Sequence, residues 1–303
     1  MSVRPLALEE ELRRRARDVR PGEPLWRHVS MRIGGPADLL VIPRALEELR
    51  QTARFLFDRR IPFITLGQGS NVLIADAGIR GVVVKVGKGT DRTRFDGSRV
   101  AAEAGLGLPY LAQEAARRGL AGLEFAAGIP ASVGGAVVMN AGAHGHAMSE
   151  VTVRARVIGP EGERDLDRSG LEFAYRTSAL QGQPAVVLEV EVELTAAPAV
   201  EVRQRMDTWL AQRNATQPIG PPSSGCVFRN PDGDHAGRLI DLAGCKGMAV
   251  GDAVVSEIHA NYIVNRDRAT AANVLALIER VRARVRERAG RQLELEIKVL
   301  GEI

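Results

Sequence analysis

Residues 61–86 read IPFITLGQGSNVLIADAGIRGVVVKV, and this stretch decides the fold class. Three apolar runs, at residues 61–66, 72–75 and 81–86, predict three short strands separated by glycine turns. Two parallel neighbours need a crossover connection, which is usually a helix. Because no helix fits between runs this close together, the stretch favours an α+β fold over a doubly wound parallel sheet.

Longer elements are predicted on both sides of this stretch. Apolar residues at helical spacing predict helices at residues 45–60 and 108–118, and strands are expected at residues 99–103 and 151–158. Residues 186–194 give the clearest signal, because four aliphatic residues alternate with glutamates, which predicts a half-buried antiparallel strand. The four are Leu188, Val190, Val192 and Leu194.

The last block of the chain follows a proline-rich break at residues 217–222. A helix is expected between Pro198 and this break, and a helix at residues 270–289 and a strand at residues 293–300 are expected beyond it. The inward positions of the later helix are Val274, Leu277, Ile278, Val281 and Val285. The changes of pattern divide the chain into three predicted segments, 1–88, 89–198 and 199–303.

The composition indicates a globular chain of 303 residues, of which 45% are apolar and 26% charged. A net charge of only +4 and an aromatic content of 4% argue against nucleic-acid binding. Two cysteines, Cys226 and Cys245, cannot form a disulfide framework. The N-terminus has no apolar leader, and no run approaches the roughly 20 apolar residues of a membrane span. We therefore expect a cytoplasmic protein without a membrane anchor.

A glycine turn, Gly67-Gln-Gly69-Ser70-Asn71, follows the first of the three short strands. The sixth position of a dinucleotide fingerprint is Val72, and a strand follows in place of a helix, so the Rossmann interpretation fails. Such a turn can still hold a diphosphate through its backbone N–H groups. An ordinary tight turn explains the same residues equally well.

Glycine and alanine are dense at residues 125–142, and charge is absent after Glu124. A backbone surface of this kind suits a large, partly apolar ligand, although a close-packed pair of helices is the alternative. The residues of interest in it are Gly128, Ile129, Pro130, Ser132, Gly134, Gly135 and Asn140.

Two further segments carry reactive or charged groups. Tyr175 and Arg176 are adjacent, so a guanidinium could bind a carboxylate or a phosphate there, although an exposed arginine beside a tyrosine is more often structural. Cys226 and Asn230 lie between glycine and proline in a predicted loop, and a free cysteine is more often a buried small apolar residue.

These four segments, in this order, resemble the UDP-N-acetylenolpyruvoylglucosamine reductases, which are flavoenzymes of peptidoglycan synthesis. Nearly the whole chain takes part, because further matching pieces lie at residues 30–37, 239–247, 255–265 and 295–301. The resemblance implies a two-part FAD-binding domain of the vanillyl-alcohol-oxidase type, followed by a smaller α+β substrate domain. It also implies non-covalent FAD held by the two glycine-rich segments, with NADPH and a UDP-sugar as substrates. Little sequence separates Tyr175 from the strand at 186–194, so the extra substrate-capping loop of the longer subgroup is absent.

Residue roles follow from the resemblance. Arg176 and Glu296 would support the reacting carboxylate, and Cys226 would donate a proton. Tyr175 and Asn230 are expected to contact the substrate. No metal, nucleic acid, membrane or obligatory protein partner is expected.

The reaction explains these residue types. Hydride addition to an enolpyruvyl ether places negative charge beside its carboxylate, which a permanently cationic arginine can meet. An ionised Glu296 would repel that charge, so we expect its pKa to be raised. Alternation along residues 293–300 places Glu296 on the face opposite the apolar residues. An exposed glutamate on the solvent face of an edge strand would fit the same pattern.

Other functions are weaker alternatives. Another FAD oxidoreductase of the same fold, acting on a hydroxy acid or lactone, is the main alternative. His144 and His146 could suggest a metal site, but no third ligand is near in sequence. A catalytically inactive nucleotide-binding protein is the third.

Overall fold

The computed structural model describes residues 5–302. Met1–Arg4, at the N-terminus where no apolar leader was expected, lies outside the described residues. Within this range the chain forms two units. Unit 1 holds residues 5–21, 39–68 and 81–212, and unit 2 holds residues 22–38, 69–80 and 213–302.

The two units interleave along the chain, whereas the predicted segments 1–88, 89–198 and 199–303 are consecutive. Residues 22–38 and 69–80 belong to unit 2 because Met31, Ile33 and Leu73 share a hydrophobic core with C-terminal residues. The three-segment division stays a prediction.

The first sheet has the order β1-β2-β5-β3, formed by β1 (Val19–Pro24), β2 (Pro36–Val41), β5 (Ile79–Lys85) and β3 (Phe63–Leu66). β3 and β5 pair in parallel, with Phe63 opposite Val82. The expectation that no helix fits between these strands is confirmed, yet β3 and β5 still pair in parallel. Residues 67–78, which include β4 (Val72–Ile74), supply the dozen-residue crossover without a helix.

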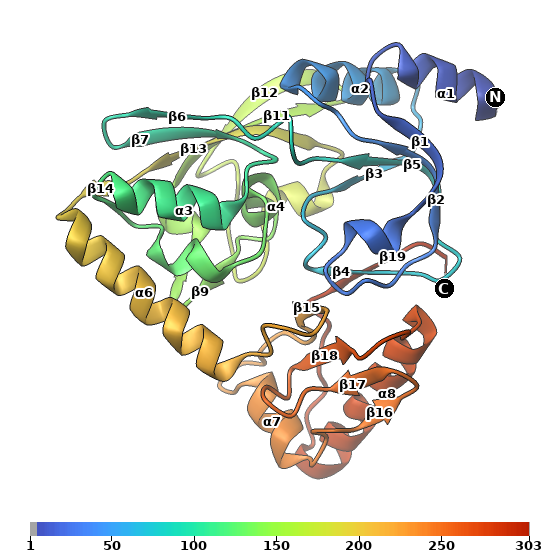
Figure 1. The fold of residues 1–303 in the computed structure, drawn as a ribbon, viewed down its shortest axis with the longest axis vertical. Helices are drawn as coiled ribbons and strands as arrows, with labels where there is room; N and C mark the ends of the chain where they lie inside the picture. The colour runs from blue at the N-terminus through green and yellow to red at the C-terminus, as the bar shows by residue number, and fades with distance from the viewer. Residues whose placement is uncertain (1–4, 303) are drawn as a thin grey trace. The chain divides into compact units, whose positions relative to one another are not determined.

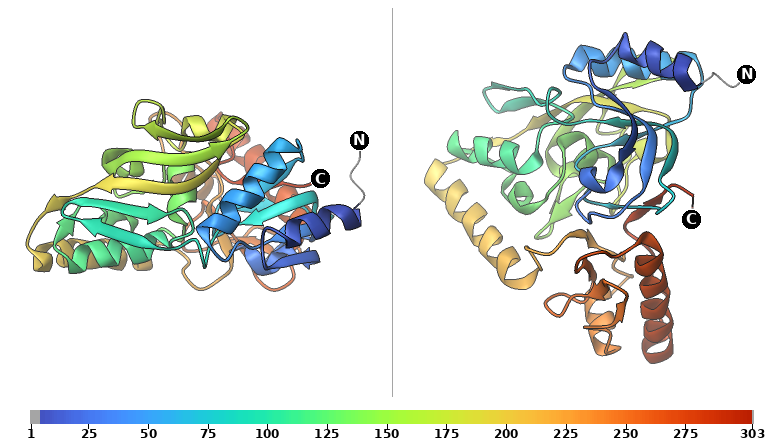
Figure 2. Two further views of the ribbon diagram at one scale, coloured as in Figure 1. Left: turned by 90° about the horizontal axis from the view of Figure 1, so that it is seen from above. Right: turned by 45° about the vertical axis from the view of Figure 1, so that its right-hand side comes forward.

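The second sheet is antiparallel and lies in unit 1, with the order β12-β11-β13-β7-β6. Its strands are β12 (Gly162–Asp167), β11 (Thr152–Gly159), β13 (Val186–Glu193), β7 (Arg99–Glu103) and β6 (Thr93–Asp96). The left view of Figure 2 shows β6 and β7 beside β13. β13 confirms the strand predicted at residues 186–194, because its alternate side chains Leu188, Val190 and Val192 are buried.

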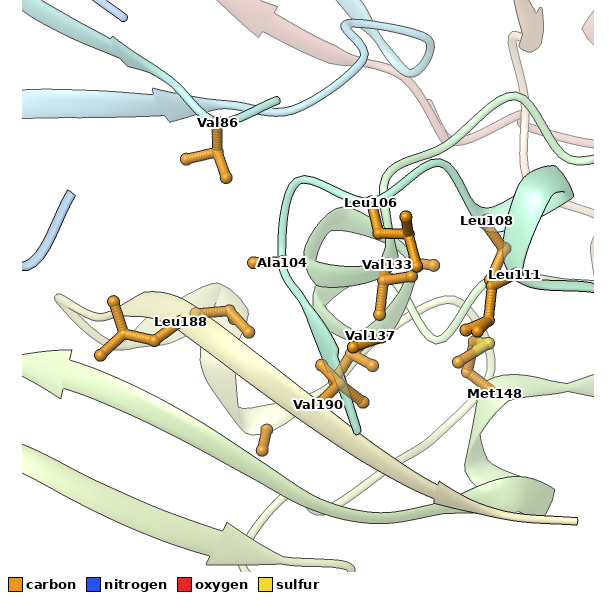
Figure 3. Close-up of a cluster of buried hydrophobic side chains, with 14 of the residues drawn as sticks. Val86, Ala104, Leu106, Leu108, Leu111, Val133, Val137, Met148, Leu188 and Val190 are labelled. Atoms are coloured by element: carbon orange, nitrogen blue, oxygen red, sulfur yellow. The ribbon is translucent and has the colours of Figure 1, made fainter. Parts of the chain in front are cut away.

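Helices cover this sheet in unit 1 (Figure 1). α2 (Leu46–Asp58) packs on β11 and β13, and α4 (Val133–Val138) packs on β13 and β7. Figure 3 shows Val137 of α4 beside Val190 of β13. The other helices of this unit are α1 (Pro5–Arg13), α3 (Leu108–Arg117), α5 (Met148–Val151), η2 (Glu124–Gly128) and η3 (Ala179–Gly182). The long α6 (Ala199–Thr216) begins in unit 1, and its last four residues belong to unit 2. Short strand pairs are β9 (Gly142–Ala143) with β10 (His146–Ala147), and β8 (Leu120–Ala121) with β14 (Thr195–Ala196).

Unit 2 is built on an antiparallel sheet with the order β15-β18-β17-β16. These strands are β15 (Ser223–Cys226), β18 (Tyr262–Asn265), β17 (Ala253–Val255) and β16 (Ala249–Val250). α8 (Ala271–Ala289) packs on β16, β17 and α7 (Ala236–Leu242), and is the long helix at lower right in the right view of Figure 2. The five predicted inward positions of α8 are all buried. η1 (Leu25–His28) also belongs to this unit.

The C-terminal strand is shorter than predicted. β19 spans Lys298–Leu300 and pairs in parallel with β4. Residues 293–297 instead bond to a loop, with Arg229 N donating to Glu294 O and Glu296 N donating to Val227 O. The predicted alternation still holds at Leu293 and Ile297, which are buried. Over residues 5–302, no helix combines the length and apolar character needed to cross a membrane.

Candidate active site

Gly67, the first residue of the glycine turn, meets the second glycine-rich segment inside unit 1. A Cβ on Gly67 would lie less than 3.0 Å from Oγ of Ser132, so any side chain there would displace the serine. The Gly67 carbonyl also accepts a hydrogen bond from Nζ of Lys85 at the end of β5. Burial lowers the pKa of Lys85 to about 8. The turn is thus fixed from two sides.

The backbone of this turn is suited to an anion. No described acceptor takes a hydrogen bond from the N–H groups of residues 67–71, whereas the carbonyls of Gly69 and Asn71 accept bonds from Ser30 N and Lys298 N. A cluster of backbone donors without protein acceptors is the chemistry that a diphosphate requires. The turn therefore fits the role expected for it in FAD binding.

At the start of α4, by contrast, the backbone N–H groups already donate hydrogen bonds to acceptors of the protein. Val133 N and Gly134 N donate to the carbonyls of Leu106 and Ala104, and Gly135 N donates to Oγ of Ser132, the N-cap. A Cβ on Gly134 would lie 2.8 Å from Cβ of Ala104, so close packing explains this glycine. Contacts to FAD from Gly134 and Gly135 would have to be van der Waals contacts. The nearby Ile129 N is also used, by Ala126 O.

Tyr175 and Arg176 form the tip of a tight turn in unit 1. Ala174 and Thr177 exchange two backbone hydrogen bonds of 3.1 Å each, which leaves the two residues between them as the loop. The guanidinium carbon of Arg176 lies 5.4 Å from the centre of the Tyr175 ring. About half of Tyr175 is exposed, so this pair can meet a ligand.

Cys226 and Glu296 come together in unit 2. Cys226 ends β15, and the next residue, Val227, accepts a 2.8 Å hydrogen bond from Glu296 N. Asn71 Nδ2 donates to Glu296 O over 3.3 Å. A Cβ on Gly225 would lie 4.0 Å from Ser70 O. The end of the glycine turn, the cysteine and the glutamate therefore form one cluster.

Tyr262 is a member of this cluster that sequence reasoning missed. It pairs directly with Cys226 across β15 and β18, is buried, and donates from its hydroxyl to Oε1 of Gln217 over 2.7 Å. Burial, together with the adjacent Cys226, raises the pKa of this tyrosine. Its only sequence signal was its place in residues 255–265, because strand pairing between distant segments is not visible in the pattern.

The remaining candidates are placed as follows. Asn230 is exposed, and its Oδ1 accepts a hydrogen bond from Ala236 N at the start of α7. His144 and His146 both lie against the ring of Trp209, with centroid distances of 5.2 and 5.5 Å. Among residues 5–302, no three His, Cys, Asp or Glu side chains are grouped so that they could hold a metal ion.

Comparison with known proteins identifies the family. The family model described as FAD binding domain matches residues 37–164, and the model described as UDP-N-acetylenolpyruvoylglucosamine reductase, C-terminal domain, matches residues 217–300. UDP-N-acetylenolpyruvoylglucosamine reductase 2 of Symbiobacterium thermophilum is 47% identical over 298 residues, which cover 97% of each chain. The chain belongs to the UDP-N-acetylenolpyruvoylglucosamine reductase family.

Two further reductases of this family agree over nearly their whole length. The Bacillus subtilis protein is 41% identical over 296 residues, covering 97% of this chain and 98% of its own. The crystal structure of the Thermus caldophilus reductase superposes with a TM-score of 0.80 at 37% identity, covering 93% of this chain and 98% of that one. The predicted order of an FAD-binding domain followed by a smaller domain that mixes helices and strands is confirmed. The assignment of the first domain to the vanillyl-alcohol-oxidase type stays a prediction.

Proposed function

We propose that the chain reduces UDP-N-acetylenolpyruvoylglucosamine to UDP-N-acetylmuramate with NADPH, as an FAD-dependent enzyme of peptidoglycan precursor synthesis. Membership of the reductase family over nearly the whole chain supports this. The observation that carries it is the cluster of Cys226, Glu296 and the 69–71 turn in unit 2. The backbone contacts of this cluster support the proposal, because they bring Cys226 and Glu296 next to a turn that we infer binds FAD.

FAD, when bound, supplies a carrier that takes a hydride from NADPH and gives it to the terminal carbon of the enolpyruvyl group. The free N–H groups of residues 67–71 hold its diphosphate. Gly67 and Ser132 let the two glycine-rich segments meet without a side chain between them. Gly128 and Pro130 of the second segment would contact the same ligand.

The protein residues then handle charge and protons. Arg176 pairs with the substrate carboxylate as negative charge develops on it. Glu296, in its acid form, donates a hydrogen bond to the same group. Cys226 gives its proton to the carbon next to the carboxylate, so hydride and proton together convert the enolpyruvyl ether to a lactyl ether. Tyr175 and Asn230 contact the sugar nucleotide.

The proposed setting is the cytoplasm, where thiols stay reduced. Neither Cys226 nor Cys245 forms a disulfide within residues 5–302, which agrees with the proposed setting. NADPH and the UDP-sugar are the small-molecule partners, and the reaction requires no nucleic acid, membrane or second protein.

The test is an anaerobic assay of the purified FAD-loaded protein. NADPH should bleach the flavin, and UDP-N-acetylenolpyruvoylglucosamine should restore its colour with formation of one UDP-N-acetylmuramate per NADPH, measured by mass spectrometry. UDP-N-acetylglucosamine, which lacks the enolpyruvyl group, is the control and should not reoxidise the flavin. A protein that binds no FAD would contradict the proposal. So would a reduced flavin that the sugar nucleotide does not reoxidise but that the oxidised form of a hydroxy acid or lactone substrate does.

A further inference from the structure

The turn that carries Arg176 has an unfavourable backbone conformation. Arg176 has φ of +55°, in the left-handed region that non-glycine residues rarely adopt. A conformation of this kind persists only where the surrounding structure holds it, and such positions are concentrated at functional sites. Two bonds between Ala174 and Thr177 close the turn, but they do not fix it relative to the rest of unit 1.

Three side chains fix it. Gln181 Nε2 donates to the carbonyl of Arg176 over 3.0 Å and to that of Val138 over 3.2 Å. Ser178 Oγ donates to the same Val138 carbonyl over 2.8 Å. Asn140 Nδ2 donates to the carbonyl of Ala174 over 2.9 Å.

All three side chains connect the turn to one part of the fold. Val138 is the last residue of α4, and Asn140 follows its C-cap, Met139. Both sides of the turn are therefore anchored to the C-terminal end of the glycine-rich segment. The helix inside that segment packs on β13 and β7, which makes it a rigid support.

Asn140 is committed to this support. It is buried and has φ of +42°, and its Oδ1 accepts a hydrogen bond from Ser149 N over 2.9 Å. Both polar ends of its side chain are thus bonded within unit 1. The side chain serves the turn, and Asn140 N donates to Val137 O. The backbone carbonyl and the second Nδ2 hydrogen are therefore the groups of Asn140 left for the FAD contact expected from the sequence.

We propose that Gln181 is a positioning residue for Arg176, acting with Asn140 and Ser178 to hold the arginine in place for the substrate carboxylate. The inference rests on the proposed function, because it assumes that Arg176 meets that carboxylate. A guanidinium on a long side chain loses catalytic effect when its backbone shifts by even 1 Å, which can cost about 100-fold in rate. Gln181 donates to the carbonyl of Arg176 itself, so this hydrogen bond acts directly on the residue that has the left-handed backbone conformation.

The direct test is Gln181→Met, which keeps the length of the side chain and removes its donor. Stopped-flow measurement should show flavin reduction by NADPH within about twofold of the parent, whereas reoxidation by UDP-N-acetylenolpyruvoylglucosamine should slow by at least about tenfold. Gln51→Met is the matched control, since Gln51 is exposed on α2 and bonds only to Glu47 among the contacts of its side chain. It should leave both rates unchanged.

A double-mutant cycle separates positioning from general damage. In an Arg176→Ala background, Gln181→Met should slow reoxidation no further, because its effect passes through the arginine. Ser178→Ala, which removes one bond to Val138 without changing the turn sequence, should give a smaller slowing with the same dependence on Arg176. These readouts do not depend on a small loss of folding stability, which would affect both half-reactions.

Each outcome decides between the claims. If the parent does not turn over the sugar nucleotide, the proposed function fails before this inference is reached. If the parent is active and Gln181→Met reoxidises at the parent rate, the positioning role is refuted. A Gln181→Met effect that persists in the Arg176→Ala background also overturns it.

Discussion

The hydroxyl of Tyr262 donates a hydrogen bond to Oε1 of Gln217 over 2.7 Å, on the strand position paired with Cys226. Because the pKa of Tyr262 is raised by burial and by Cys226, this hydroxyl stays protonated at any pH at which the enzyme would work. Tyr262 is thus a constant neighbour of the proposed proton donor. A pH dependence of proton donation by Cys226 must therefore come from a group other than Tyr262.

Tyr262→Phe should lower the free energy of unfolding by about 1 kcal/mol, because it leaves Gln217 Oε1 without its donor. Urea denaturation measures this loss. Tyr110→Phe, at an exposed tyrosine of α3, is the control and should cost nothing measurable. An unchanged midpoint in Tyr262→Phe would mean that the hydrogen bond does not contribute to stability.

Cys226 should govern the alkaline side of the activity profile. A thiol can give a proton to carbon only in its acid form, so turnover should fall as the Cys226 thiolate accumulates at alkaline pH. Cys226→Ser should recover much of the turnover that Cys226→Ala loses, and should remove the alkaline decline. Tyr262→Phe should keep the decline. Rates of flavin reoxidation at pH 6 to 10 test this.

Cys245 provides the contrast for that series. It is buried in the core of unit 2, and burial raises the pKa of its thiol. Cys245→Ser should change neither half-reaction by more than about twofold. If the Cys226→Ala protein reoxidises its flavin at the parent rate, Cys226 is not the proton donor, and its thiol has only a packing role.

Glu296 and Arg176 should act only in the half-reaction with the sugar nucleotide. Glu296→Gln and Arg176→Ala should bind FAD and accept hydride from NADPH as the parent does. Reoxidation should slow by at least about a hundredfold in each, which is the usual scale for one oriented group at a developing oxyanion. Equal slowing of both half-reactions would indicate a damaged flavin site.

Lys85 should give the protein a pH-dependent stability. Its pKa is about 8 when folded, against about 10.4 when unfolded, so between these values the unfolded chain holds a proton that the folded protein has released. Stability therefore rises with pH through this window, by at most about 3 kcal/mol. Lys85→Met removes this contribution. The free energy of unfolding of the parent should therefore rise relative to that of the variant between pH 7 and pH 10.

Urea unfolding of both proteins at the two pH values measures that gain, and groups common to both cancel. Lys88→Met, at an exposed lysine three residues on, is the matched control and should track the parent. A parent and a Lys85→Met variant whose stability difference is constant with pH would show that Lys85 is solvated in the folded state.

Gly134→Ala should destabilise unit 1, because the added methyl group would lie 2.8 Å from Cβ of Ala104. Overpacking of this kind costs about 1–3 kcal/mol. Gly87→Ala is the control, since a Cβ at Gly87 meets nothing within 4 Å. If thermal unfolding finds the two variants alike, then α4 can move away from Ala104 at no cost.

The sequence predicted best those elements whose buried face repeats within one segment. The alternation in β13 and the helical spacing in α8 were interpreted correctly, because each pattern reports burial of its own residues. The parallel pairing of β3 with β5 was missed, since pairing depends on where a distant strand lies. The same limit explains the short β19, whose preceding residues bond to the loop at 227–229.

The candidate site was predictable only as separate pieces. Glycine turns, an arginine beside a tyrosine and a cysteine between glycine and proline are local signals, although Cys226 lies at the end of β15 and not in the predicted loop. Tyr262 beside Cys226, and Gln181 on the carbonyl of Arg176, arise from hydrogen bonds that no local pattern reports. The lowered pKa of Lys85 does have a local signal in the sequence, because this lysine interrupts an apolar run. A charged amine within a buried strand loses part of its hydration.

The pairing of β4 with β19, and the two hydrogen bonds from Ala271 N and Ala272 N to the carboxylate of Asp76, have a consequence for biosynthesis. Residues 69–80 leave the ribosome long before their partners, which are the start of α8 and the last strand of the chain. Until then the apolar Leu73 and Ile74 have no native cover, and the edge of β4 is open to other chains. Nascent chains that stall before residue 298 should therefore depend on chaperones more than the finished protein does.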